Sequence, residues 1–130
     1  MDKILPLFIQ WTKLKIRIQL SKNRLYCKEG EVWWASMGIN IGVEENGKHE
    51  KFERPVLILK VFNKHMFWAI PFTSQPKLSP YYISIVFNEK TSYLILSQVR
   101  LLSTKRLRRK VAKISFNELL KIRGEVKKLL

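Results

Sequence analysis

The sequence is poor in the residues that form disulfides, metal sites and phosphate-binding loops. Its 130 residues include a single cysteine, Cys27, so no disulfide can form within the chain. The two histidines, His49 and His65, have no cysteine or second histidine at the spacing of metal ligands. The five glycines are scattered and make neither a P-loop nor a dinucleotide-binding fingerprint. The sequence therefore predicts neither a metal nor a cofactor.

Acidic residues and long apolar runs are also scarce. Ten Asp and Glu residues stand against 25 Lys and Arg residues, giving a net charge of +15 at pH 7. Such a surplus in a small chain indicates an anionic partner: nucleic acid, an anionic membrane surface or an acidic protein. No apolar stretch approaches the roughly 20 residues of a membrane span. Basic residues interrupt the N-terminal stretch, which argues against a signal peptide. We therefore expect a cytoplasmic protein.

The apolar content is nevertheless that of a folded protein. Hydrophobic residues make up 46% of the chain and aromatic residues 12%, far more than a disordered chain contains. A chain of this length buries one core without disulfides or metals, so we expect a single domain. The acidic residues are unevenly placed, because residues 29–53 hold six of the ten.

Both ends of the chain have helical patterns. Near the N-terminus, apolar residues recur at spacings of four, three and four, on one helix face: Leu7, Trp11, Leu14 and Ile18. Residues 15–20 also alternate as a strand would, but the helix, over about residues 7–21, is favoured. Near the C-terminus, Ser115 and Glu118 form a capping box before a second helical pattern.

Between the helices the residues have strand character, with a long polar loop over 38–53. Strands are predicted over 31–36, 55–61, 66–70, 81–87 and 92–101. The continuous apolar run 55–61 is typical of a strand buried on both faces. Pro71 and Pro76 bracket a predicted turn, and Trp33, Trp34 and Trp68 are expected in the core. Short strands joined by tight turns indicate a small barrel or sandwich.

Two short motifs at strand ends carry groups that could bind a phosphate. Arg54 precedes Pro55, which pushes it toward extended geometry and could aim its guanidinium from a strand end. Read alone, a surface arginine paired with Glu50 or Glu53 is the favoured alternative. The second motif, Thr73-Ser74-Gln75, offers hydroxyl and amide donors, and alone it is read as a polar turn.

A third group of polar residues lies in the C-terminal half. Gln98 and Arg100 precede a run with five positive charges in six residues: Lys105, Arg106, Arg108, Arg109 and Lys110. With the overall charge, this run is interpreted as an anion-contacting patch along a phosphate backbone rather than as a solvated turn. His49, in the polar loop, is a weak acid–base candidate.

Three motifs, in this order, resemble the PemK/MazF family, the toxins of type II toxin–antitoxin systems. They are Gly30-Glu31-Val32-Trp33-Trp34, Arg54-Pro55-Val56-Leu57-Ile58-Leu59 and Pro71-Phe72-Thr73-Ser74-Gln75. The later stretch Gln98-Val99-Arg100 matches the family's Asp-Gln-hydrophobic-Arg/Lys motif except at its first position, which is Ser97. The resemblance covers about residues 28–130.

The resemblance implies an α+β, β-dominated fold, an SH3-like barrel with a helix at each end. The expected parts are an N-terminal helical extension (1–27), a β-barrel (28–114) and a C-terminal helix (115–130), together one domain. It also implies a homodimer that cleaves single-stranded mRNA without a metal and is neutralised by an acidic antitoxin. In that chemistry the ribose 2′-OH attacks the adjacent phosphate and leaves a 2′,3′-cyclic phosphate.

The family's residue roles transfer only in part. Arg54 matches the catalytic arginine and Thr73 the catalytic threonine. The expected RNA contacts are Ser74, Gln75, Gln98, Arg100, Lys105, Arg106, Arg108, Arg109 and Lys110. Ser97 and Ile95 depart from the acidic residue and arginine of Kid-like members, so their acid–base assignment does not transfer. The general base stays open among His49, Glu50 and Glu53.

Three other functions stay open on the sequence. The same barrel could be a non-catalytic RNA-binding module, which would bind RNA in a salt-sensitive way without cutting it. It could be a toxin that poisons a topoisomerase, which would inhibit supercoiling and leave RNA intact. The basic N-terminal helix could bind a membrane surface, which removal of residues 1–22 would abolish.

Overall fold

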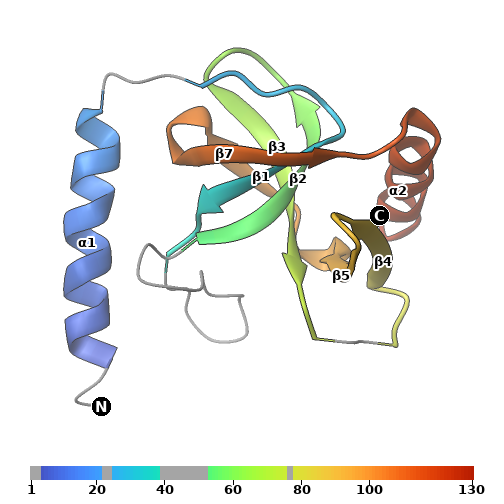
Figure 1. Cartoon of the computed structure of the whole chain (residues 1–130), viewed down its shortest axis with the longest axis horizontal. Helices are drawn as coiled ribbons and strands as arrows, with labels where there is room; N and C mark the ends of the chain where they lie inside the picture. The colour runs from blue at the N-terminus through green and yellow to red at the C-terminus, as the bar shows by residue number, and fades with distance from the viewer. Residues whose placement is uncertain (1–3, 22–24, 39–52, 76–77) are drawn as a thin grey trace.

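The computed structural model describes residues 4–21, 25–38, 53–75 and 78–130, and shows a strongly bent β-sheet with a helix on either side (Figure 1). The helices are α1 (Ile4–Leu20) and α2 (Phe116–Lys128), with short 3-10 turns η1 (Leu96–Gln98) and η2 (Thr104–Arg106). The strands are β1 (Glu31–Ser36), β2 (Glu53–Val61), β3 (Met66–Thr73), β4 (Tyr82–Phe87), β5 (Lys90–Ile95), β6 (Arg100–Ser103) and β7 (Leu107–Lys113). This confirms the predicted β-dominated, SH3-like barrel with flanking helices.

Strand β3 joins the two halves of the sheet. The strand order is β4-β5-β3-β2-β1-β7, with β6 also paired to β3, and every pairing is antiparallel. The first half of β3 pairs with β6, from Met66 to Ala69, and its last two residues pair with β5. One strand therefore carries the chain from one half of the barrel to the other.

Strand β2 is buried on both faces, as its apolar run predicts. Val56 and Ile58 lie in one buried cluster with Trp33 and Phe67, while Leu57 lies in a second cluster beneath α2. Because successive side chains of a strand point to opposite faces, a strand that serves two cores needs an unbroken apolar run.

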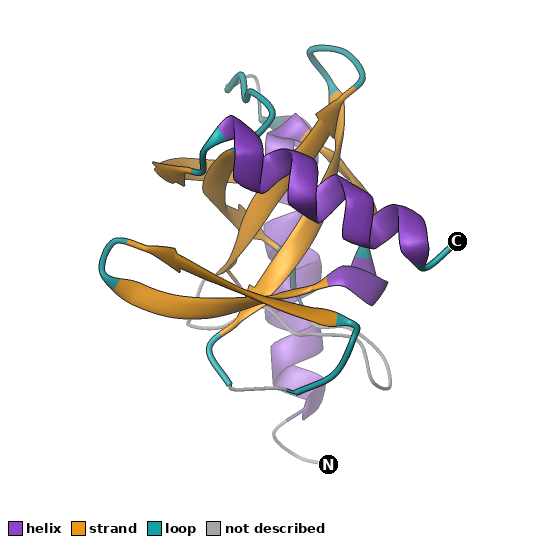
Figure 2. Cartoon of the chain, turned by 90° about the vertical axis from the view of Figure 1, so that its right-hand side faces the viewer, coloured by secondary structure: helices purple, strands orange, loops and turns teal. Residues whose placement is uncertain are grey.

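Helix α2 begins at the predicted capping box. The Ser115 side chain accepts from the Glu118 backbone N–H, and the Glu118 carboxylate accepts from the Ser115 backbone. Leu119 and Ile122 are buried against the barrel, and Figure 2 shows α2 lying across one end of it. The helix thus closes the cluster that contains one face of β2.

Helix α1 confirms the helix predicted near the N-terminus. It packs on the barrel through one stripe of residues. Trp11 and Ile18 are buried, and the Arg106 guanidinium lies 5.6 Å from the centre of the Trp11 ring. Lys105 Nζ donates to the Gln19 carbonyl oxygen at 2.8 Å, near the C-terminal end of the helix where carbonyls lack partners. None of the described helices is long and apolar enough to cross a membrane.

Several local predictions were wrong. The turn between the two prolines begins later than predicted, because β3 continues through Thr73. The strand predicted over 92–101 is broken by η1, and most of the basic run forms strand β7. Trp68 is 42% exposed and Trp34 is only half-buried, because their neighbours Phe67 and Trp33 take the inward positions of the alternation.

The contact between α1 and the barrel depends on Gly38. A Cβ at this position would lie 2.0 Å from Cε2 of Trp11, and its φ of +74° disfavours other residues. We expect Gly38→Ala to displace α1, lower the melting temperature and speed tryptic cleavage after Lys13 and Arg17. Gly124→Ala is the control: it lies in α2 with no atom within 4 Å, and should stabilise by about 0.5–1 kcal/mol. Unchanged trypsin resistance in Gly38→Ala would contradict the Trp11 placement.

Candidate functional site

Arg54 lies within the barrel wall rather than on the surface. It occupies the second position of β2, pairs with Ala35 of β1 and is 3% exposed. Its Nη1 donates to the carbonyl oxygen of Phe72 at 2.7 Å. The surface alternative for Arg54 is therefore wrong, and the guanidinium is held in a fixed orientation against the end of β3.

Thr73 ends the neighbouring strand on the same side. Val56 pairs with Pro71, so continuing this antiparallel register by two residues brings Arg54 opposite Thr73. Thr73 is 5% exposed, and its hydroxyl oxygen accepts from the Gln75 backbone N–H at 3.3 Å. The hydroxyl hydrogen is thus left to donate elsewhere.

Arg54 and Thr73 line one pocket of about 500 Å³. Lys90, at the start of β5, lines it as well. The other lining residues are Trp34, Pro55, Phe72, Ser74, Phe87, Asn88, Ser92 and Val111. Arg54 and Lys90 are both cationic, and no carboxylate is found in the lining among the residues that the structure describes. Such a pocket favours a ligand in which an anionic group is flanked by flat or apolar groups.

An ion pair between a buried glutamate and an exposed arginine borders the pocket. The Glu53 carboxylate, 5% exposed, accepts from Arg109 Nη1 at 3.0 Å. The Arg109 guanidinium lies 5.1 Å from the centre of the Trp34 ring, and Trp34 in turn lines the pocket. Because Glu53 directly precedes Arg54, this chain of contacts fixes the start of β2 to β7 across β1.

The remaining predicted site residues are divided among several places. Ser74 lines the pocket, and Gln75 reaches it through its backbone contact with Thr73. Gln98 and Arg100 lie in η1 and β6, and neither lines the pocket. The loop candidates His49 and Glu50 lie outside the described residues.

The basic run does not form one continuous patch. Lys105 and Arg106 contact α1, as described above, and Arg108 donates to the Ser36 hydroxyl at 2.8 Å. Arg109 pairs with Glu53 and Lys110 with Glu31. Successive side chains of a strand point to opposite faces, and Glu53 and Glu31 each bind one cation. Neighbouring cations of the run therefore point in different directions.

Sequence reasoning missed Lys90, Asn88 and Trp34 as pocket residues. The β4–β5 hairpin folds over the end of β3, and its tight turn has positive φ at Asn88 (51°) and Glu89 (64°). Nothing in the local pattern places this turn beside β2. For Trp34 a signal existed, since only one of two adjacent tryptophans on a strand can face the core.

Glu31 is the most heavily bonded carboxylate near the start of β1. Its oxygens accept from Lys28 N at 2.7 Å and Trp33 Nε1 at 3.0 Å, and pair with Lys110 Nζ at 2.9 Å. Burial alone would raise the pKa of Glu31, but these donors outweigh it and hold the pKa below its usual value. Burial and the Glu31 charge raise the pKa of Cys27 to about 11, so this thiol stays protonated near neutral pH.

The fold matches solved toxin structures. The chain is similar to MazF from Deinococcus radiodurans, with 19% identity, a TM-score of 0.65, and coverage of 81% of this chain and 96% of that one. A MazE–MazF complex from the same organism matches with 19% identity, a TM-score of 0.62, and coverage of 81% and 95%. A mycobacterial endoribonuclease bound to its cognate antitoxin gives 16% identity, a TM-score of 0.56, and coverage of 78% and 92%.

The sequence match defines the family. Residues 28–130 match the model described as the PemK-like, MazF-like toxin of type II toxin-antitoxin systems. No curated protein sequence matches the chain significantly. The match spans well over half of the chain, which therefore belongs to this toxin family, as the motifs predict. Helix α1 precedes the matched residues.

The Glu31 contacts predict a pH-dependent stability. A carboxylate whose folded pKa is depressed stabilises the protein above its unfolded pKa, near 4.5, and this contribution is lost as the pH falls through the folded value. We expect Glu31→Gln to lower the free energy of unfolding by about 1–3 kcal/mol at pH 7, and by clearly less at pH 3. Urea unfolding at both pH values measures this.

Glu125→Gln is the matched control, because Glu125 pairs with Lys128 within one helix. Such pairs contribute little, so we expect a change under about 0.5 kcal/mol. A Glu31→Gln penalty that is equal at pH 7 and pH 3 would contradict the depressed pKa.

Proposed function

We propose that this protein is a metal-independent endoribonuclease toxin that cuts single-stranded mRNA. The observation that carries the proposal is the shared pocket of Arg54 and Thr73, with Lys90 as a second cation and no carboxylate in its described lining. This combination suits a phosphodiester, whose charge grows during cleavage. Family membership supports the same conclusion.

The proposed reaction is an internal displacement at phosphorus. A base takes the proton of the ribose 2′-OH, and the 2′-oxygen bonds to phosphorus. The bond from phosphorus to the 5′-oxygen breaks, and the 5′-oxygen takes up a proton from the protonated base or from water. The products are a 2′,3′-cyclic phosphate and a 5′-hydroxyl. Arg54 stabilises the charge on the phosphoryl oxygens, and the Thr73 hydroxyl donates to one of them. An arginine suits this role because its guanidinium keeps its proton even when buried.

The base is proposed to be His49, Glu50 or Glu53, in the segment that precedes Arg54. Among these, Glu53 is described, and its carboxylate is bonded to Arg109. The Glu53 carboxylate holds Arg109, whose guanidinium lies over the Trp34 ring, one residue away from the reacting arginine. Separate substitution of the three candidates would assign the proton acceptor.

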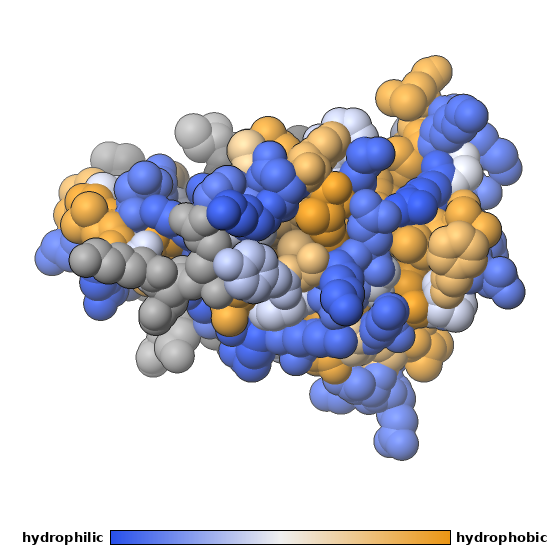
Figure 3. All heavy atoms as spheres, turned by 90° about the horizontal axis from the view of Figure 1, so that it is seen from above, coloured by the Kyte–Doolittle hydropathy of each residue, from blue (hydrophilic) through white to orange (hydrophobic). Residues whose placement is uncertain are grey.

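RNA binding is proposed to extend from the pocket along the basic surface. Trp34, with Arg109 above its ring, offers an aromatic face for a base, and Ser74 offers a hydroxyl. Arg100 and Arg108 would contact the phosphate backbone further along. Blue, hydrophilic side chains cover much of the barrel surface in Figure 3.

We also propose that the active toxin is a homodimer and that an acidic antitoxin neutralises it. The solved complexes of MazF-type toxins with antitoxins support this partner. A net charge of +15 supports an acidic one. An extended or helical acidic segment laid over Arg54 and Lys90 would exclude RNA.

The test is cleavage of a long single-stranded RNA in excess EDTA, with the product ends mapped. We expect discrete cuts that leave 2′,3′-cyclic phosphates, and rates at least about 100-fold lower for Arg54→Ala and Thr73→Val. Thr73→Val keeps the side-chain shape and removes the hydroxyl. Lys121→Ala, on exposed α2 surface, should cut at the wild-type rate.

Melting temperatures accompany the assay, because Arg54→Ala also removes the buried bond to the Phe72 carbonyl oxygen. Folded variants that cut at the wild-type rate would contradict the site. Intact RNA across many sequences, with tight and salt-sensitive binding, would favour a non-catalytic RNA-binding module instead.

A further inference from the structure

Helix α1 carries a second apolar stripe, which is exposed. Trp11 and Ile18 face the barrel on one side. On another side, spaced four, seven and four residues apart, lie four exposed apolar residues: Leu5 (63% exposed), Ile9 (48%), Ile16 (55%) and Leu20 (74%). These spacings place them on one helix face. Apolar atoms are exposed at the end of the molecule where α1 lies (Figure 3).

The flanks of this stripe are basic. Lys13, Lys15 and Arg17 lie among its residues, and α1 contains no Asp or Glu. Ion pairs given by the structure for the described residues involve none of these three cations. The helix therefore combines exposed apolar surface with charge of one sign.

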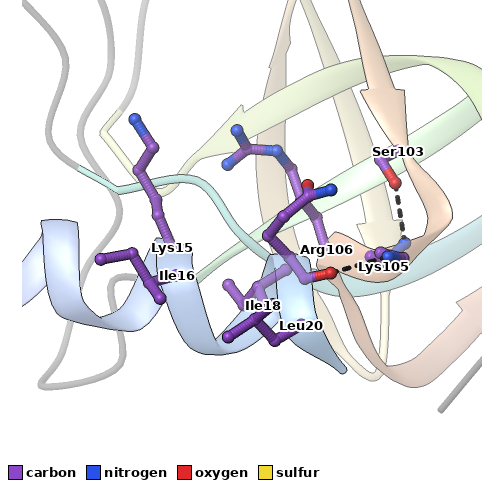
Figure 4. A pocket seen from close by; sticks show the side chains of 8 residues that line it. Lys15, Ile16, Ile18, Leu20, Ser103, Lys105 and Arg106 are labelled. Atoms are coloured by element: carbon purple, nitrogen blue, oxygen red, sulfur yellow. Dashed lines mark hydrogen bonds between the residues drawn. The ribbon is translucent and has the colours of Figure 1, made fainter. Parts of the chain in front are cut away.

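The stripe borders a groove between α1 and the barrel. This pocket, of about 400 Å³, is lined by Ile16 and Leu20 of the stripe, by Lys15, and by Lys105 and Arg106 of η2 (Figure 4). Burial and the nearby charge of Arg100 lower the pKa of the Arg106 guanidinium. A partly desolvated cation of this kind is stabilised by an anionic neighbour.

We propose that this groove and stripe form a docking site for an acidic, amphipathic segment of a protein partner. Apolar side chains of the segment would cover Ile16 and Leu20, and its carboxylates would face Lys15, Lys105 and Arg106. The identification of this partner with the antitoxin rests on the proposed function, whereas the docking chemistry does not. No residue lines both this groove and the Arg54 pocket, so the segment anchors a partner outside the reacting site.

Charge and shape favour this occupant over the alternatives. A second copy of α1 would bring its own Lys13, Lys15 and Arg17 against those of the first, and like charges repel at such spacings. A membrane surface would contact the stripe but leave the concave groove beneath Arg106 unfilled. RNA would match the cations but leave the stripe exposed, since its backbone offers no apolar side chains.

The test uses a synthetic helical peptide with leucines along one face and glutamates on the others, and a scrambled peptide of the same composition. We expect salt-sensitive binding of the first peptide, weakened roughly tenfold by Ile16→Ser. Ile4→Ser is the matched control, because Ile4 is 54% exposed on the same helix but lies outside the stripe. Lys15→Glu should weaken binding, and Lys121→Glu on α2 should not.

Several results would overturn the proposal. These are no binding of the peptide, equal binding of the scrambled peptide, and equal loss in Ile4→Ser and Ile16→Ser. Self-association that Ile16→Ser abolishes, or binding to vesicles of anionic lipid with no binding of the peptide, would do so too. Arg54→Ala separates this inference from the proposed function: it should bind the peptide normally while RNA cleavage is lost, and Ile16→Ser should do the reverse.

Discussion

The pairing of β2 with β3 is the constraint on which the rest of the structure depends. β2 is buried on both faces and serves two apolar clusters, so its register cannot slip by one residue without exposing one set of side chains and burying the other. The same register places Arg54 beside the end of β3, where its guanidinium bonds to the Phe72 carbonyl. The packing that holds the barrel together therefore also positions the two candidate catalytic side chains.

Three of the carboxylates that the structure describes act as internal counterions. Glu29, Glu31 and Glu53 are each paired with a cation from the C-terminal half: Arg123, Lys110 and Arg109, respectively. These pairs tie β1, β2 and the segment before β1 to β7 and α2. They also divide the cations into a group that builds the barrel and a group that remains available to an anionic partner.

Helix α1 stands apart from this arrangement, since it precedes the residues that match the family model. It is attached through Trp11 over Gly38 and through Lys105 at its C-terminal end. A helix that only served the core would have one apolar stripe. The second, exposed stripe with basic flanks supports the proposal that α1 binds an acidic partner in addition to the barrel.

The sequence by itself determined the elements whose signals are local. The helix periodicity of α1, the Ser115 capping box and the apolar run of β2 each reflect neighbours along the chain, and the motifs around Arg54 and Thr73 were enough to indicate the family. The tertiary structure alone decided where β7 pairs, that Trp34 and Lys90 line the pocket, and that the basic run is divided between carboxylates and α1. These outcomes depend on contacts between residues far apart in the chain, and no spacing within a single segment encodes which distant strand or carboxylate a side chain will meet.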